Sequence, residues 1–322
     1  MTQSRRRFLL GAAAGAAILS LPSQKAQAVV LGAGPAGAHA ALSLARAQPG
    51  LSVVLVERDP TRFNPVPDHQ ARFLRVNTMI AYGTLQEAGV EIVLDEAVGI
   101  DWSARGIKLF SGRVLAFDRL YLAPGAEAVP EDIAGLDARA RHMWPAAWGS
   151  PREAHRLQTQ IARLPEDGHV VLRLPKDLSH PAVAHDRAVW LAGNCKRLTV
   201  LDGGRHVQLR DAFHALLPTN KIDWYMAGEG GQVLSVNAEA GRIETDAGLL
   251  TARVVNFVPQ QGAGRIARSA GLVDETGWCP VDARGRSTRR PGVTVLGDGR
   301  RDTSRVAQDA IHDACHVEMT AP

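Results

Sequence analysis

The stretch VVLGAGPAGAHA, residues 29–40, decides the fold of this chain. Val29 to Leu31 form a β-branched and apolar run that predicts a buried strand, and Ala38 to Ala47 predict a helix of small residues. Between them Gly32, Gly34 and Gly37 complete the pattern G-x-G-x-x-G. A strand, a glycine-rich turn and a helix in this order predict the first unit of a parallel α/β sheet that binds a dinucleotide.

Each glycine has a physical reason. Gly32 permits the tight turn, Gly34 lets the backbone approach a pyrophosphate, and Gly37 lets the helix pack on the strand. The first helical residues offer N–H groups and a partial positive charge to the phosphates. Residues 51–56 predict the second strand. Glu57 follows at its end, where an acidic side chain can accept hydrogen bonds from a ribose.

A second element near the end of the chain favours FAD over NAD, which the glycine pattern alone cannot separate. Residues 292–296 predict a strand that closes on Gly297, Asp298 and Gly299. Flavoproteins with two dinucleotide-binding domains place such an aspartate beside the FAD ribityl chain, so we expect the chain to return to its first domain. The candidate cofactor contacts are Gly32, Gly34, Pro35, Ala36, Gly37, Glu57, Arg58, Pro124, Gly125, Gly297 and Asp298.

The middle of the chain repeats an earlier pattern. The interval between Gly106 and Gly241 equals that between Pro124 and Pro259, and in both copies a short alternating hairpin leads into an apolar strand that ends in proline. This predicts two nested Rossmann-like domains of the disulfide-reductase type, with a first FAD-binding part over 29–145, an NAD-binding-like domain over 146–255 and a second FAD-binding part over 256–322.

The inserted domain has the strands of a dinucleotide-binding unit without its glycines. Residues 169–174 and 198–202 predict two strands, but no glycine occurs between Pro175 and Gly193. Without glycines the backbone cannot approach a pyrophosphate closely. We therefore expect no NAD(P) binding and an electron donor other than NADPH.

The N-terminus resembles an export signal. The motif SRRRFL (residues 4–9) precedes an apolar run to Leu21, and AQA (residues 26–28) is a small-x-small cleavage pattern. These features predict a twin-arginine signal over 1–28 and a periplasmic protein, the alternative being an uncleaved membrane anchor. Cleavage after Ala28 would start the mature chain at Val29, which is also expected in a buried strand.

The charge balance argues against nucleic-acid binding. The chain has 37 Lys and Arg against 33 Asp and Glu, and four of the basic residues but no acidic one lie in the first 28 positions. The remaining chain is therefore balanced, so it lacks the basic surplus that nucleic-acid binding requires.

Longer strings resemble the flavoprotein subunit of flavocytochrome c sulfide dehydrogenase over most of residues 29–300. The most specific are VNFVPQQGAG (255–264) and GWCPVD (277–282), and the others include GVEIV (89–93), FDR (117–119), APGAE (123–127) and AGL (270–272). This resemblance implies non-covalent FAD, a small sulfur substrate, and electron transfer to a c-type cytochrome subunit or a soluble cytochrome c.

The resemblance also assigns Cys279 as the sulfur nucleophile beside the flavin, a role that suits a thiolate. The chain departs from the family at three places. The second reactive cysteine, expected near residues 176–184, is absent, with Ser179 and His180 as the nearest polar groups. No cysteine follows Glu57 to link the flavin, and the C-terminal interface domain is missing.

Three hypotheses therefore stay open. The chain is a sulfide dehydrogenase of the flavocytochrome c type, an FAD flavoprotein with another donor, or a catalytically inert relative that acts as a partner in sulfur metabolism. For Cys279 the alternative to catalysis is a buried hydrophobe. For His180 and His185 the alternative to an acid–base role is an ordinary surface histidine.

Overall fold

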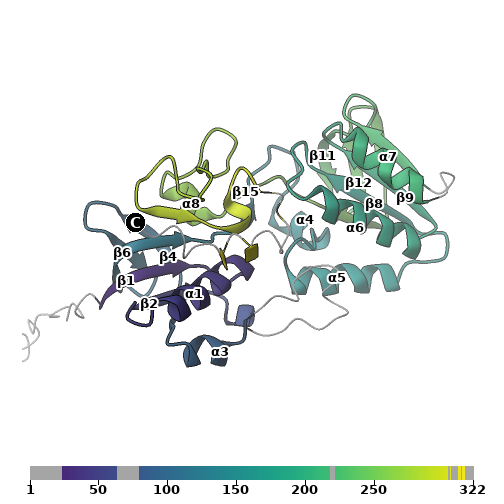
Figure 1. Cartoon of the computed structure of the whole chain (residues 1–322). Helices are drawn as coiled ribbons and strands as arrows, with labels where there is room; N and C mark the ends of the chain where they lie inside the picture. The colour runs from purple at the N-terminus through teal and green to yellow at the C-terminus, as the bar shows by residue number, and fades with distance from the viewer. Residues whose placement is uncertain are drawn as a thin grey trace, which may run out of the picture.

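The computed structural model describes residues 24–63, 80–217 and 222–303, together with residues 305, 311, 312, 314 and 315. Within these residues the chain forms two α/β domains that lie side by side (Figure 1). The first domain is built from the two ends of the described chain, and the second lies between them in sequence. The expected twin-arginine motif lies outside the described residues.

The first domain begins with β1 (Gln24–Leu31), α1 (Pro35–Ala47), β2 (Val53–Glu57), η1 (Pro60–Phe63), α3 (Tyr82–Glu87), β3 (Glu91–Leu94), β4 (Ala97–Asp101), β5 (Gly106–Leu109), β6 (Val114–Leu122) and β7 (Ala126–Ala128). The second contains α4 (Ala138–Met143), α5 (Pro151–Ala162), β8 (His169–Leu174), α6 (Pro181–Asn194), β9 (Arg197–Asp202), α7 (Val207–Leu216), β10 (Ile222–Met226), β11 (Val233–Asn237), β12 (Arg242–Thr245), β13 (Gly248–Thr251) and β14 (Val254–Phe257). The first domain resumes with β15 (Gln261–Ala263), α8 (Arg265–Ser269), β16 (Val293–Val295) and η3 (Gly297–Gly299).

The sheet of the first domain has the order β3-β2-β1-β6-β5-β4, and β16 also pairs with β6. Strands β3, β2, β1, β6 and β16 are parallel neighbours, whereas β4, β5 and β6 form an antiparallel meander. The long β6 pairs with β5 near its start and with β16 near its end. The late return of the chain to its first domain is therefore confirmed.

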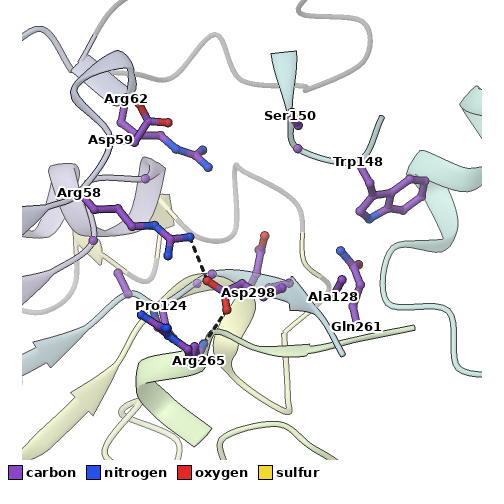
Figure 2. Close-up of a pocket in the computed structure, with 18 of the residues that line it drawn as sticks. Arg58, Asp59, Arg62, Pro124, Ala128, Trp148, Ser150, Gln261, Arg265 and Asp298 are labelled. Carbon is purple, nitrogen blue, oxygen red and sulfur yellow. Dashed lines mark hydrogen bonds and ion pairs between the residues drawn. The ribbon is translucent and has the colours of Figure 1, made fainter. Parts of the chain in front are cut away.

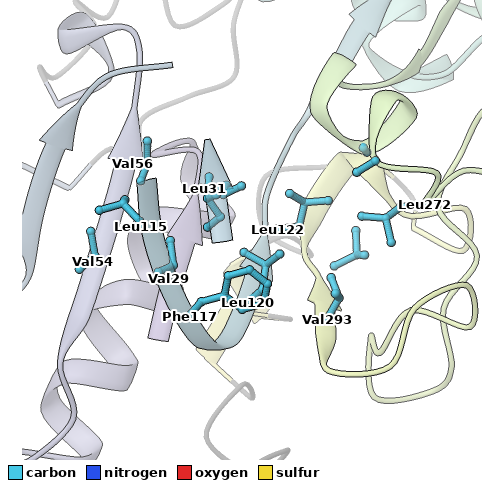
Figure 3. Packing of buried hydrophobic residues seen from close by; sticks show 14 of the residues in the cluster. Val29, Leu31, Val54, Val56, Leu115, Phe117, Leu120, Leu122, Leu272 and Val293 are labelled. Carbon is cyan, nitrogen blue, oxygen red and sulfur yellow. The ribbon is translucent and has the colours of Figure 1, made fainter. Parts of the chain in front are cut away.

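Both faces of the central strands are buried. Val29 and Leu31 point into one core cluster with Val54 and Val56, and the alternate residues of β1 and β2 enter a second cluster beneath α1. Figure 3 shows the first cluster closing against Leu272 and other residues of the C-terminal part. Continuous burial on both faces is what parallel strands require, because helices or loops cover each side.

The second domain carries a parallel sheet of order β10-β9-β8-β14 and a separate antiparallel sheet of order β11-β12-β13. β8 is buried along most of its length, and α5, α6 and α7 contribute to the cluster around it. This is the two-domain α/β architecture that the glycine pattern and the internal repeat predict.

The repeat is present in three dimensions with one difference. In the first domain the hairpin partner β6 is one continuous strand, whereas the equivalent segment of the second domain is divided at residues 252–253 into β13 and β14. β14 then leaves the antiparallel sheet and pairs with β8.

Two expected boundaries fall inside β-strands. Because β14 runs to Phe257 and pairs with β8, the second domain ends after residue 257 and not at 255. β1 begins at Gln24, and Gln24, Lys25, Ala26 and Ala28 pair with residues of β6. The boundary expected at residue 28 therefore falls inside a strand, because the sheet hydrogen bonds extend further than the apolar run that marked the strand in the sequence.

Candidate functional site: one cavity across both domains

The glycine turn after β1 has no room for side chains at two of its three glycines. Gly32 has a φ of 99°, and a Cβ atom there would lie 2.3 Å from the carbonyl oxygen of Ala123. A Cβ atom on Gly37 would lie 1.8 Å from the carbonyl oxygen of Gly32. These two glycines are therefore required by the packing of the turn itself.

Gly34 differs from its neighbours because space is open beside it. No heavy atom lies within 4 Å of the position that its Cβ would take, and its φ of −63° suits any residue. α1 starts at the next residue, and no side chain caps its N-terminus. The missing side chain thus leaves a cradle in front of unsatisfied helix N–H groups, which is the arrangement that binds a phosphate.

This cradle opens into a cavity of about 620 Å³ that both domains line. Every candidate cofactor contact expected from the sequence lies on its wall: Gly32, Gly34, Pro35, Ala36, Gly37, Glu57, Arg58, Pro124, Gly125, Gly297 and Asp298. The turn after β1 and η3 are far apart in the sequence, and the pairing of β1 and β16 with β6 brings them together. Figure 2 shows part of this wall around Arg58, Pro124 and Asp298.

Glu57 is held in place at the end of β2. Its two carboxylate oxygens accept hydrogen bonds from the backbone N–H groups of Ala33, at 2.7 Å, and Asp59, at 2.8 Å. The residue is 9% exposed and lies on the cavity wall. A carboxylate oxygen has room for more than one donor, so the fixed side chain can still accept from a ribose hydroxyl.

Arg58 belongs to an ion-pair network on the same wall. Its guanidinium lies 3.2 Å from the Glu96 carboxylate and 3.1 Å from that of Glu127, and Arg265 pairs with Glu96. Partial burial lowers the pKa of Arg58, but the two carboxylates outweigh this effect and raise its pKa above the ordinary value. The cation is therefore fixed, and it is partly neutralised by Glu96 and Glu127.

The second domain supplies the opposite wall. Its lining residues include Arg141, Trp144, Trp148, Ser150, Glu153, His180, Val183 and Phe257. Sequence reasoning raised His180 only as a general acid–base candidate and did not predict the tryptophans at this site. The close spacing of Trp144 and Trp148, in a chain with six tryptophans, was the available signal.

A polar bridge joins the two walls. The Asp298 carboxylate lies 3.4 Å from Nε2 of His180, and Nδ1 of His180 lies 2.7 Å from Oγ of Ser179. Ser179 Oγ in turn donates to Oε1 of Gln261. The Trp148 ring meets the His180 ring edge-on, with centroids 6.0 Å apart. His180 is therefore held on three sides at the boundary between the domains.

Cys279 does not take part in this site, which corrects the catalytic role expected for it. It is 0% exposed, it packs in the core cluster of the first domain, and it is absent from the cavity wall. Burial, with a contribution from Asp274, raises the pKa of its thiol to about 12. At neutral pH the thiol is therefore protonated and lies away from the cavity, as the buried-hydrophobe alternative expects.

The described part of the chain has neither a membrane-spanning helix nor a cluster of metal-binding side chains. No helix there is long and apolar enough to cross a bilayer. Nor do three or more His, Cys, Asp or Glu side chains gather there in a group that could hold a metal ion.

Known proteins share parts of this sequence and its fold. Residues 26–155 match the family model of the pyridine nucleotide-disulphide oxidoreductases. Among solved structures, a ferredoxin reductase from Rhodopseudomonas palustris is 19% identical, with a TM-score of 0.68, over 92% of this chain and 76% of its own. The sulfide:quinone oxidoreductase of Aquifex aeolicus is 17% identical, with a TM-score of 0.65, over 92% and 76% of the two chains. A NAD-dependent persulfide reductase from A. fulgidus is 17% identical, with a TM-score of 0.68, over 92% and 60%.

The chain has the fold of the pyridine nucleotide-disulphide oxidoreductases. Within that fold, the second domain departs from a dinucleotide-binding site at two points. The loop between β8 and α6 has no glycine and is bound to the first domain. The backbone N–H of Asp177 donates to the amide oxygen of Gln260, the side-chain N–H of Gln260 donates to the Asp177 carboxylate, and Ser179 donates to Gln261. This loop therefore contacts protein where the equivalent loop of the first domain faces open space.

The second departure is at the end of β9. Asp202 occupies the position that Glu57 has in the first domain, but it is 0% exposed and its carboxylate is fully engaged. It accepts from Nδ1 of His206 at 2.6 Å, from two backbone N–H groups and from the indole of Trp224. The pKa of Asp202 is lowered because these hydrogen bonds outweigh the effect of burial. No acceptor capacity is left there for a ribose.

Proposed function

We propose that this chain is an FAD-dependent oxidoreductase whose electron donor is a molecule other than NAD(P)H. The observation that carries the proposal is the shared cavity. Gly34 and Asp298, which lie near opposite ends of the chain, line one space together with Glu57 at the end of β2. A fold that brings these three positions together supports a single dinucleotide bound in extended form.

The residues present fit FAD. The open space at Gly34 and the uncapped start of α1 would hold the pyrophosphate, Glu57 would accept from the ribose, and Asp298 would accept from the ribityl hydroxyls. FAD, when bound, supplies the two-electron chemistry. The described residues of the cavity wall include no cysteine, which supports non-covalent binding.

The donor is inferred from the second domain. Its glycine-free loop is bound to Gln260 and Gln261, and Asp202 is saturated by His206 and Trp224. Both features oppose NAD(P) binding, so we propose that a substrate reaches the cavity directly and meets the wall formed by Trp148 and His180.

The test is the absorption spectrum of the purified full-length chain. We expect stoichiometric FAD that is released by denaturation without a covalent remnant. Gly34→Val should abolish FAD uptake without loss of fold, because its side chain fills the cradle while its backbone conformation is permitted. Gly83→Val, at an exposed glycine of α3 with open space around it, is the matched control and should retain FAD. A wild-type protein that takes up no FAD would refute the proposal and support the inert-partner hypothesis.

Sulfide is the second candidate donor, with a c-type cytochrome as the electron acceptor. The GWCPVD and VPQQGAG strings favour it, as does the shared fold with a sulfide:quinone oxidoreductase. Because Cys279 is sealed, sulfide would have to react with the flavin directly. We expect that any bleaching of the flavin by sulfide persists in Cys279→Ala. If bleaching is lost in that variant, while its FAD content is normal, the assignment of Cys279 to the core is wrong.

We also propose that the protein is exported to the periplasm, where c-type cytochromes would be available as acceptors. The support is the SRRRFL motif and the apolar run that follows it. Replacing Arg5 and Arg6 by Lys should trap the protein in the cytoplasm, which cell fractionation would detect.

A further inference from the structure

We propose that His180 takes up a proton when the cofactor in the cavity is reduced, so that it couples electron transfer to protonation. This inference rests on the proposed FAD site and adds a role for a residue of the second domain. It starts from the position of His180, whose side chain is 11% exposed and lines the cavity beside Asp298.

The groups around His180 would accommodate a second ring proton. Ser179 has one hydroxyl proton, and it donates that proton to the amide oxygen of Gln261. Its oxygen is then an acceptor for Nδ1 of His180, at 2.7 Å. On the other side of the ring, the Asp298 carboxylate lies 3.4 Å from Nε2. An ionised carboxylate has no proton to donate, so it can act only as an acceptor there. Both ring nitrogens therefore face groups that can accept, so the site could hold an imidazolium once a second proton is bound.

The charged groups around the ring are compatible with this state. Asp298 faces it from η3, and Glu153 of α5 lies on the same cavity wall. Two arginines are also near. The Arg187 guanidinium of α6 lies over the Trp148 ring, 5.9 Å from its centroid, and Trp148 contacts His180. Arg305 donates to the backbone oxygen of Asp298. Arg305 also lies over Trp278 at 3.7 Å. The only carboxylate in direct contact with the imidazole is that of Asp298 among the described residues.

The position of the His180 imidazole in the cavity suggests its role. If FAD binds with its adenosine near Glu57 and α1, the second-domain wall at the other end of the cavity would face its redox-active ring. Such a cofactor, when it accepts two electrons and one proton, would carry one additional negative charge. That charge would favour a second proton on the neighbouring imidazole, because opposite charges attract. In total two electrons and two protons enter the site.

His180 is also the only described residue of the cavity wall whose side chain type normally gains or loses a proton between pH 5 and 8. The other titratable residues on the wall are Asp, Glu and Arg. The inference is therefore specific to one residue.

The experiment measures the two-electron reduction potential of the FAD-loaded full-length protein between pH 6 and 9. One proton per two electrons gives a slope of about 30 mV per pH unit, and two protons give about 60 mV. We expect the wild type to show a segment with the steeper slope. His180→Gln keeps polar groups toward Ser179 and Asp298, and it should follow the shallower slope where the wild type is steep.

Direct proton counting gives a second measurement that does not need the variant. Photoreduction in weakly buffered solution with an indicator dye should show two protons taken up per flavin within the steep segment. His142→Gln is the matched control, because His142 is exposed and does not line the cavity. It should reproduce the wild-type slope.

The outcomes separate this inference from the proposed function. A wild type that binds FAD but takes up one proton at every pH would overturn the role of His180 alone. The same conclusion follows if His180→Gln retains the steep segment with normal FAD content. A protein that binds no FAD overturns both proposals.

Discussion

Cys279 shows how one buried side chain links stability to pH. Burial raises the pKa of its thiol from 9.0 to about 12. Below pH 9 the thiol is protonated in both the folded and the unfolded chain, so it contributes no pH dependence. Between pH 9 and 12 the unfolded chain ionises and the folded chain does not. Stability therefore falls as the pH rises through this window, by roughly 1.4 kcal/mol per pH unit from this group.

We predict that Cys279→Ala removes this part of the alkaline loss. The variant should be less stable than the wild type at pH 8, because it leaves a cavity in the core. By pH 10.5 the difference in the free energy of unfolding should shrink by roughly 2 kcal/mol. Urea unfolding at the two pH values measures it. A difference that stays constant with pH would show that the thiol ionises as readily in the folded protein as in the unfolded one.

The local patterns of the sequence predicted single residues well where their role depends on near neighbours. Gly32 and Gly37 are required by contacts within one turn and with Ala123, and the glycine pattern itself reports such contacts. Cys279 could not be placed in this way. Its burial depends on strands that are distant in the sequence, among them Val293 and Val295, and a resemblance in the flanking Trp278 and Pro280 carries no information about those contacts.

At the scale of the element, β1 matters because its first half is not apolar. Gln24, Lys25 and Ala26 pair with Leu115, Ala116 and Phe117 of β6, although the sequence predicted a strand only from Val29. Backbone hydrogen bonds do not depend on side-chain polarity, so the hydrophobic pattern could not reveal this extension. The internal repeat, in contrast, predicted the hairpins correctly, because alternation and turn residues mark them locally.

We predict that a chain starting at Val29 is less stable than one starting at Gln24. The shorter chain lacks the hydrogen bonds of Gln24–Ala28, and Ala28 is completely buried between β2 and β6. We expect a decrease in the melting temperature of several degrees, measured by circular dichroism on both proteins. Equal melting temperatures would show that residues 24–28 do not contribute to the sheet, and cleavage after Ala28 would then be harmless.

The loop between β8 and α6 leads to a prediction about electron donors. Because this loop is bound to Gln260 and Gln261, and because Asp202 has no free acceptor, NADH and NADPH should not reduce the flavin. Anaerobic titration of the FAD-loaded protein at 450 nm tests this, with dithionite as the positive control. Stoichiometric bleaching by either nicotinamide would show that the loop rearranges and that the proposed donor class is wrong.

At the scale of the whole molecule, the cavity depends on both domains, so cofactor binding should stabilise the chain as a unit. With FAD at about 100 times its dissociation constant, the free energy of unfolding should rise by about 2.7 kcal/mol. We predict a higher melting temperature and slower proteolysis of both domains on adding FAD, and no such effect in Gly34→Val. Protection confined to the first domain would show that the wall formed by Trp148 and His180 does not close on the ligand.

The sequence predicted the domain order but not how the domains meet. The glycine turn, Glu57 and Asp298 mark one side of the cavity. The other side comes from α4, the segment before α5 and the start of α6, whose residues carry no recognised pattern. The contact between His180 and Asp298 joins residues that only the assembled fold brings near. Long-range placement of this kind is set by the packing of β6 and β14, not by any local signal.

The two crossings between the domains run next to each other. Residues 126–128 on the way out pair antiparallel with residues 261–263 on the way back, so the whole excursion between them starts and finishes at neighbouring points. The second domain is thus connected to the first by two chain segments that lie next to each other. Joining Ala128 directly to Gln261 through a short reverse turn would excise it, and the remaining polypeptide would keep the sheet of β1, β6 and β16 uninterrupted.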